Sequence, residues 1–103
     1  MADLSQQEWV EQMGRDSDAV IIDVRTPEEV EEGRIPGAVV MNIQDTADFY
    51  QKAQTLDTSK SYYVYCRSGG RSGQACVLFK ALGINHAYNL VGGILTWKGE
   101  LIK

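Results

Sequence analysis

The apolar positions along the chain alternate between short continuous runs and stretches with helical spacing. The continuous runs are typical of strands that are buried on both faces of a sheet. Strands are predicted at residues 19–24, 38–41, 61–65 and 86–90. Helices are predicted at residues 6–13, 27–32, 46–55, 75–82 and 94–101. Because strands and helices alternate, we predict an α/β fold: an open, mostly parallel central sheet of about five strands, with helices on both faces.

Residues that favour helix ends support two of these helices. Ser5 suits the N-cap of the first helix. Thr26 and Glu29 have the spacing of a capping box, and Pro27 between them suits the first helical position. Glu29 also follows Arg25 by four residues, so the sequence predicts an ion pair between these two side chains.

Length and composition predict one domain that spans residues 1–103. A chain of 103 residues with 44% apolar side chains is large enough to form one core. No apolar run approaches the ~20 residues that a membrane span needs, and the first residues lack the basic start of a signal peptide. We therefore expect a cytoplasmic protein with no membrane association. A reducing compartment also suits its two cysteines, which are too few for a disulfide scaffold.

Charge is distributed unevenly along the chain, whose net charge is −4. Residues 1–50 contain 12 acidic and 3 basic side chains, and residues 51–103 contain 2 acidic and 7 basic ones. An acidic chain without a basic cluster argues against nucleic acid as a partner. The cationic second half would still attract a small anion to a local site.

The segment with the clearest chemistry follows the strand at residues 61–65. Cys66 comes directly after this strand, and Gly69 and Gly70 permit a sharp turn into the next helix. Backbone N–H groups of such a loop, together with a helix N-terminus, form a cradle for negative charge, to which Arg71 would add. In open α/β sheets, ligands bind beyond the carboxyl ends of the strands, which is where this loop lies.

A thiol in such a cradle has its pKa lowered, so Cys66 is the predicted nucleophile. The loop has the form Cys-x4-Arg between Cys66 and Arg71. Cysteine phosphatases use a Cys-x5-Arg loop, one residue longer, whose wider ring of amides holds phosphate. The shorter ring here favours a smaller anion, such as the single extra sulfur of a persulfide.

Two separated motifs resemble the signatures of the rhodanese family. The first comprises Asp23-Val24-Arg25, Glu29, Gly33, Ile35-Pro36-Gly37-Ala38 and Asn42-Ile43. The second comprises Cys66-Arg67-Ser68-Gly69-Gly70-Arg71-Ser72, Ala75, Gly83 and the segment from Asn89 to Trp97. The resemblance covers about residues 19–98 and implies a rhodanese-like fold. One departure is Arg34, which stands where many relatives have a histidine.

The resemblance implies a sulfurtransferase that needs no cofactor. Cys66 would attack the outer sulfur of thiosulfate or another persulfide donor, and the resulting persulfide would pass its sulfur to cyanide or a thiol. Arg71 and Arg67 would bind the donor's oxygens. The substrate and persulfide-binding loop would comprise Arg67, Ser68, Gly69, Gly70, Arg71 and Ser72. Asp23 and Arg25 would be supporting residues that tie loops together. A protein acceptor of the sulfur stays unidentified.

Three other functions stay open at this point. A binding or regulatory module could keep the fold without turnover, although the presence of Cys66 and Arg71 argues against it. A thiol redox sensor would form a Cys66 sulfenate or a Cys66–Cys76 disulfide after mild oxidant, but we expect Cys76 to be a buried helical residue. Phosphatase or arsenate-reductase chemistry is disfavoured by the short loop. One histidine, His86, and two cysteines do not make a four-ligand zinc set, so no metal is expected.

Overall fold

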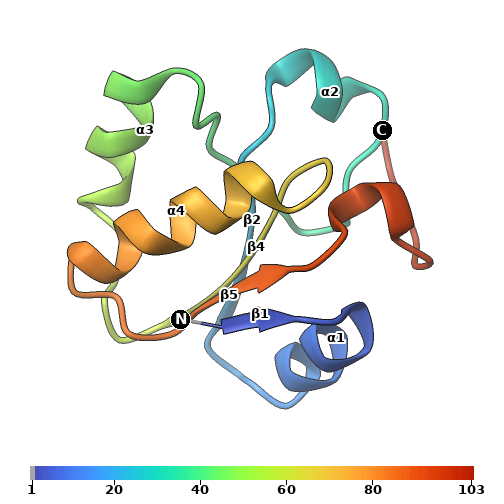
Figure 1. The fold of residues 1–103 in the computed structure, drawn as a ribbon, viewed down its shortest axis with the longest axis horizontal. Helices are drawn as coiled ribbons and strands as arrows, with labels where there is room; N and C mark the ends of the chain where they lie inside the picture. The colour runs from blue at the N-terminus through green and yellow to red at the C-terminus, as the bar shows by residue number, and fades with distance from the viewer. Residues whose placement is uncertain (1) are drawn as a thin grey trace.

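The computed structural model describes residues 2–103 and has a parallel sheet flanked by helices (Figure 1). The strands are β1 (Ala2–Leu4), β2 (Ala19–Asp23), β3 (Val39–Val40), β4 (Ser61–Tyr65) and β5 (Ala87–Leu90). The helices are α1 (Gln6–Gly14), α2 (Pro27–Glu31), α3 (Thr46–Ala53), α4 (Gly70–Ala81) and the 3₁₀ helix η1 (Gly93–Thr96). The five strands lie in the order β1-β5-β4-β2-β3, and each neighbouring pair is parallel. The α/β prediction is confirmed.

The central strand β4 supplies side chains to both layers of the core. Tyr62 and Val64 pack on the side of α3 and α4, against residues such as Phe79. Tyr63 and Tyr65 point to the opposite side and pack around Trp9 of α1, which is fully buried. This alternation follows from the two-residue period of a strand. Burial of each large apolar side chain contributes about 1.5–3 kcal/mol, so β4 anchors both layers.

The structure differs from the sequence-based prediction at both ends of the chain. The edge strand β1 was not predicted, because three residues with a central Asp3 show no apolar run. The helix predicted at residues 94–101 is wrong: η1 ends at Thr96, and Trp97 has an extended backbone. Beyond Trp97 the chain turns back, and Ile102 forms an antiparallel bridge with Arg34.

None of the helices described for residues 2–103 has the length and apolar character that a membrane span requires.

Parallel pairing brings the carboxyl ends of the inner strands to one edge of the sheet. Asp23 at the end of β2 is paired with Tyr65 at the end of β4, and Val64 is paired with Asn89 in β5. The residues that follow these strands therefore meet above the same edge. This edge is where the loop that begins at Cys66 lies.

Candidate active site

The loop after β4 is held from outside by the segment around η1. The amide of Ile94 donates to the carbonyl of Cys66 at 3.0 Å, and the amide of Leu95 donates to that of Arg67 at 3.1 Å. Gly69 has φ +109°, a left-handed conformation that favours glycine, and it is the N-cap of α4. Because its carbonyls are bonded outward, the loop is free to direct amides inward.

These inward donors surround the sulfur of Cys66. The amide of Gly69 donates to Sγ at 3.1 Å, and the hydroxyl of Ser72 lies 3.4 Å from it. Burial raises the pKa of the Cys66 thiol, but hydrogen bonds from the Ser72 hydroxyl and from the amides of Ser72, Gly69 and Ser68 outweigh it. The net effect is a pKa below the ordinary thiol value, so the thiolate is favoured.

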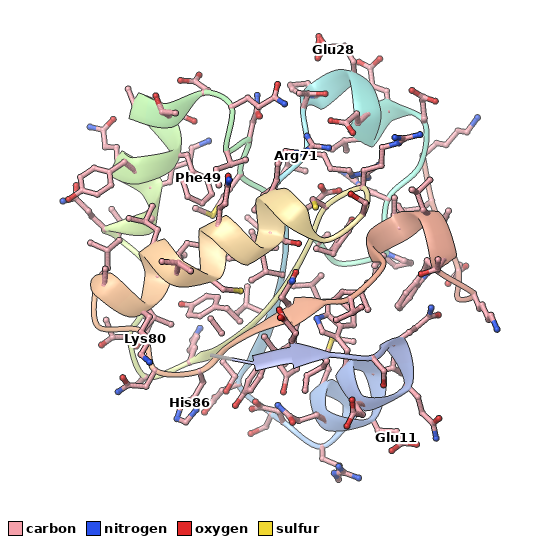
Figure 2. The ribbon with its side chains drawn as sticks, in the orientation of Figure 1. Glu11, Glu28, Phe49, Arg71, Lys80 and His86 are labelled. Atoms are coloured by element: carbon pink, nitrogen blue, oxygen red, sulfur yellow. The ribbon has the colours of Figure 1, made fainter. Side chains whose placement is uncertain are left out.

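Arg71 lies at the N-terminal turn of α4, as Figure 2 shows, but its guanidinium does not bond to the sulfur. It makes two hydrogen bonds to the carboxylate of Glu29, at 2.7 and 2.8 Å. Bonding to Arg71, reinforced by Thr26, lowers the pKa of Glu29 to about 2. The expected ion pair between Glu29 and Arg25 is therefore wrong, because Arg71 occupies the carboxylate. The capping box of Thr26 and Glu29 is confirmed.

Arg25 instead forms a buried network at the end of β2. Its guanidinium bonds to the carboxylate of Asp23 at 2.7 Å and to the carbonyls of Gly33 and Glu29 at 2.7 and 3.3 Å. The hydroxyl of Tyr65 donates to the same carboxylate at 2.6 Å. Asp23 and Arg25 thus join the ends of β2 and β4 to the chain around α2, and neither contacts the sulfur of Cys66 through a hydrogen bond among the described residues.

A pocket of about 380 Å³ opens beside the loop. Its polar side chains are Arg25, Glu29, Glu32 and Arg67, and its apolar ones are Ile94, Leu95 and Leu101. Arg67 is exposed and, within residues 2–103, has no carboxylate at ion-pair distance. Ser68 and Gly70 of the same loop are also exposed. A larger pocket of about 530 Å³ lies between α1 and Trp97, but it contains no predicted site residue.

Among the described residues, the other candidates, Cys76 and His86, make no hydrogen bond to the sulfur of Cys66. Cys76 is fully buried in α4, where burial and then the charge of Asp3 raise the pKa of its thiol to about 12. His86, labelled in Figure 2, is exposed and directly precedes β5, whereas Cys66 follows the carboxyl end of the parallel strand β4. In the part of the chain that the structure describes, no three His, Cys, Asp or Glu residues come together as metal ligands.

Sequence reasoning missed Asn89 as a site residue. It is 6% exposed in β5, and its amide nitrogen donates to the carbonyl of Gly69 at 3.1 Å and to the carboxylate of Asp3 at 2.9 Å. Its side-chain oxygen accepts from the hydroxyl of Ser72. The available signal was a buried polar residue in a strand, which needs hydrogen-bond partners.

Comparisons with known proteins indicate the family of this chain. Residues 6–100 match the model of the rhodanese-like domain. YtwF of Bacillus subtilis is 40% identical over 90 residues, which cover 87% of this chain and 84% of YtwF. The thiosulfate sulfurtransferase GlpE of Pseudomonas syringae is 32% identical over 84 residues, covering 82% of this chain and 76% of GlpE.

A solved structure supports the same assignment. The rhodanese-like domain protein of Staphylococcus aureus superimposes with a TM-score of 0.83 at 29% identity, covering 99% of this chain and 97% of that one. The family model matches nearly the whole chain, and the solved structure shares its fold. This chain therefore belongs to the rhodanese-like domain family.

Proposed function

We propose that this chain is a sulfurtransferase in which Cys66 carries the transferred sulfur as a persulfide. The observation that supports this most directly is the ring of donors, from Gly69 and Ser72, around a buried Sγ. Such donors stabilise a thiolate and, by the same interactions, the anionic outer sulfur of a persulfide. The name of GlpE, thiosulfate sulfurtransferase, supports thiosulfate as one donor.

The reaction proceeds in two steps. In the first, the Cys66 thiolate attacks the outer sulfur of thiosulfate, a new S–S bond forms, the donor's S–S bond breaks, and sulfite leaves with its electron pair. In the second, cyanide or an acceptor thiolate attacks the outer sulfur of the persulfide. Thiocyanate or a new persulfide leaves, and the Cys66 thiolate is restored.

Arg67 is the better candidate for first contact with an anionic donor. Arg71 shares its charge with Glu29, so a donor oxygen must compete with that carboxylate. Arg67 lines the pocket beside the loop and is exposed. The loop residues Ser68, Gly69, Gly70 and Ser72 would then hold the transferred sulfur, while Asp23 and Arg25 keep the strand ends in place.

We further propose that residues 1–103 act as one rhodanese domain in the cytoplasm. Both cysteines are free thiols, which suits a reducing compartment. The proposed partners are small sulfur donors and acceptors rather than nucleic acid or a membrane, and the chemistry of the loop needs no cofactor.

Intact-mass measurement tests the carrier. The protein is incubated with thiosulfate, its mass is measured before and after cyanide, and Cys66→Ala and Cys76→Ala are treated in parallel. We expect the gain of one sulfur in the unaltered protein and in Cys76→Ala, removal of that sulfur by cyanide, and no gain in Cys66→Ala. No gain from thiosulfate or from an organic persulfide would contradict the proposal and favour a binding module. A Cys66–Cys76 disulfide after mild oxidant would favour a redox sensor.

A further inference from the structure

Asn89 connects the edge strand β1 to the loop that holds the nucleophile. Its amide nitrogen donates to two acceptors, the Asp3 carboxylate at 2.9 Å and the Gly69 carbonyl at 3.1 Å. Because both neighbours only accept hydrogen bonds, the orientation of the amide is fixed. The side-chain oxygen of Asn89 must then face the hydroxyl of Ser72.

The hydroxyl of Ser72 has one proton and two acceptors within reach. One is the oxygen of Asn89, and the other is Sγ of Cys66 at 3.4 Å. When Cys66 is a neutral thiol, Ser72 can donate to Asn89 and accept from the thiol. When Cys66 is a thiolate, the same proton stabilises the sulfur instead. Asn89 and the thiolate therefore compete for the Ser72 proton.

Asn89 also supports the second donor to the sulfur. The carbonyl of Gly69 is bonded to Asn89, while the amide of Gly69 donates to Sγ at 3.1 Å. Bonds on both sides of this residue limit the rotation of the backbone that aims the amide. We propose that Asn89 is a positioning residue for Cys66, acting through the Ser72 hydroxyl and the Gly69 backbone and itself oriented by Asp3.

The proposal rests on Cys66 being the nucleophile proposed above. Its test uses alkylation, which needs no sulfur donor, so failure of sulfur transfer and failure of the positioning role are separate results. Other charged or titratable groups near the loop are Asp3 on β1, Asp23 and Arg25 at the end of β2, Glu29 on α2, Arg67 in the loop, and Arg71 and Cys76 on α4. The control variants must therefore leave these groups in place.

The test measures the rate of iodoacetamide alkylation of Cys66 against pH, with the modified residue located by mass spectrometry. Asn89→Asp keeps the side-chain shape but holds the Ser72 proton with a charged oxygen and loses both donors. We expect its alkylation midpoint to rise by about one pH unit or more, equivalent to roughly a tenfold lower rate below the midpoint. Asn85→Asp adds the same charge at an exposed position before β5 and should leave the midpoint unchanged.

Ser72→Ala tests whether Asn89 acts on Cys66 through the Ser72 hydroxyl. It leaves the bonds of Asn89 to Asp3 and Gly69 in place. We expect Ser72→Ala to raise the alkylation midpoint by less than Asn89→Asp does. When Asn89→Asp is added to Ser72→Ala, its further shift of the midpoint should be less than half of the shift that it causes alone. A midpoint that does not move in Ser72→Ala would overturn the proposal, even if Asn89→Asp fails to fold. Equal shifts from Asn89→Asp with and without Ser72 would overturn it as well. Lower thermal stability of Asn89→Asp with an unchanged midpoint would show a structural role only.

Discussion

The two cysteines of this chain occupy regions that differ in chemistry but not in exposure. Cys66 in the loop is 1% exposed and Cys76 in α4 is 0% exposed. The pKa of Cys66 is lowered, whereas burial raises that of Cys76 to about 12. The loop directs amides and a hydroxyl at its sulfur, while the amides of a helix interior bond to carbonyls one turn earlier. Hydrogen-bond donors, rather than solvent access, separate the lowered pKa of Cys66 from the raised pKa of Cys76.

Alkylation of the native protein should show the largest difference between these regions. At pH 7 we expect Cys66 to react at least about 100-fold faster than Cys76, because the thiolate fraction follows the pKa. The rate at Cys66 should rise with pH and level off at a midpoint below that of an ordinary thiol. Peptide mass mapping after timed quenching gives both rates.

Unfolding the protein in urea provides the control for this difference. In the unfolded chain, the loop donors and the helix are lost, so the two thiols should react at rates within about threefold of each other. Comparable rates in the native protein would show that the loop donors do not activate Cys66.

Substitution of Gly93 should damage the loop region and leave α4 intact. A Cβ at Gly93 would collide with the carbonyl oxygen of Arg67 and lie 2.6 Å from that of Cys66, and φ is +58°. We expect Gly93→Ala to lower the free energy of unfolding by about 2–3 kcal/mol and to slow Cys66 alkylation. Urea unfolding followed by tryptophan fluorescence measures the first effect.

Gly14→Ala is the matched control, because nothing lies within 4 Å of a Cβ at that position. Its free energy of unfolding should change by less than about 1 kcal/mol, and its Cys66 alkylation should not change. If Gly93→Ala alkylates at the normal rate, contact with the segment around η1 is not what shapes the loop.

The smallest expected effect concerns the ion pair of Glu29 and Arg71, which lies next to the loop of Cys66. The folded-state pKa of Glu29 is about 2, below the value of 4.5 for a free carboxyl. Its stabilising contribution is therefore complete above pH 4.5 and is lost as the pH falls toward 2. For a pair about one quarter exposed, we expect about 1 kcal/mol.

Glu29→Gln keeps the capping box but removes the charge. Its free energy of unfolding should be lower than that of the unaltered protein at pH 7, and the two values should converge between pH 4 and pH 2. Glu31→Gln, at an exposed position in the same helix, should follow the unaltered protein throughout. A constant difference across this range would mean that Glu29 does not act through its charge.

The sequence was sufficient to predict the elements that contain long apolar patterns. The strand Ser61–Tyr65 was predicted because burial dominates its composition. The helix predicted at residues 75–82 is present but begins earlier, at Gly70, because its first turn carries loop residues with no apolar pattern. The edge strand β1 was missed, since a three-residue strand needs its partner β5 to exist. The final helix was wrong because the pairing of Ile102 with Arg34 outweighs local helical spacing.

In the candidate site, features that are local in sequence could be predicted, and contacts made by packing of distant residues could not. The position of Cys66 could be predicted because the strand, the glycines and the cysteine are adjacent in sequence. The partner of Arg71 could not, because Glu29 is 42 residues away and only the packing of α2 against the loop brings them together. Asn89 was likewise hidden, because its contacts with Asp3 and Ser72 arise from strand order rather than sequence spacing.

The short strand β1 also protects its neighbour from unwanted association. It occupies the outer side of β5 through the register Ala2 to Tyr88, Asp3 to Asn89 and Leu4 to Leu90. Without it, β5 would present unpaired backbone groups at the edge of the sheet, which is a template for pairing with another molecule. A chain that lacks residues 1–5 should therefore aggregate more readily than residues 1–103, which would assign to the three residues of β1 a role in keeping the sheet edge covered.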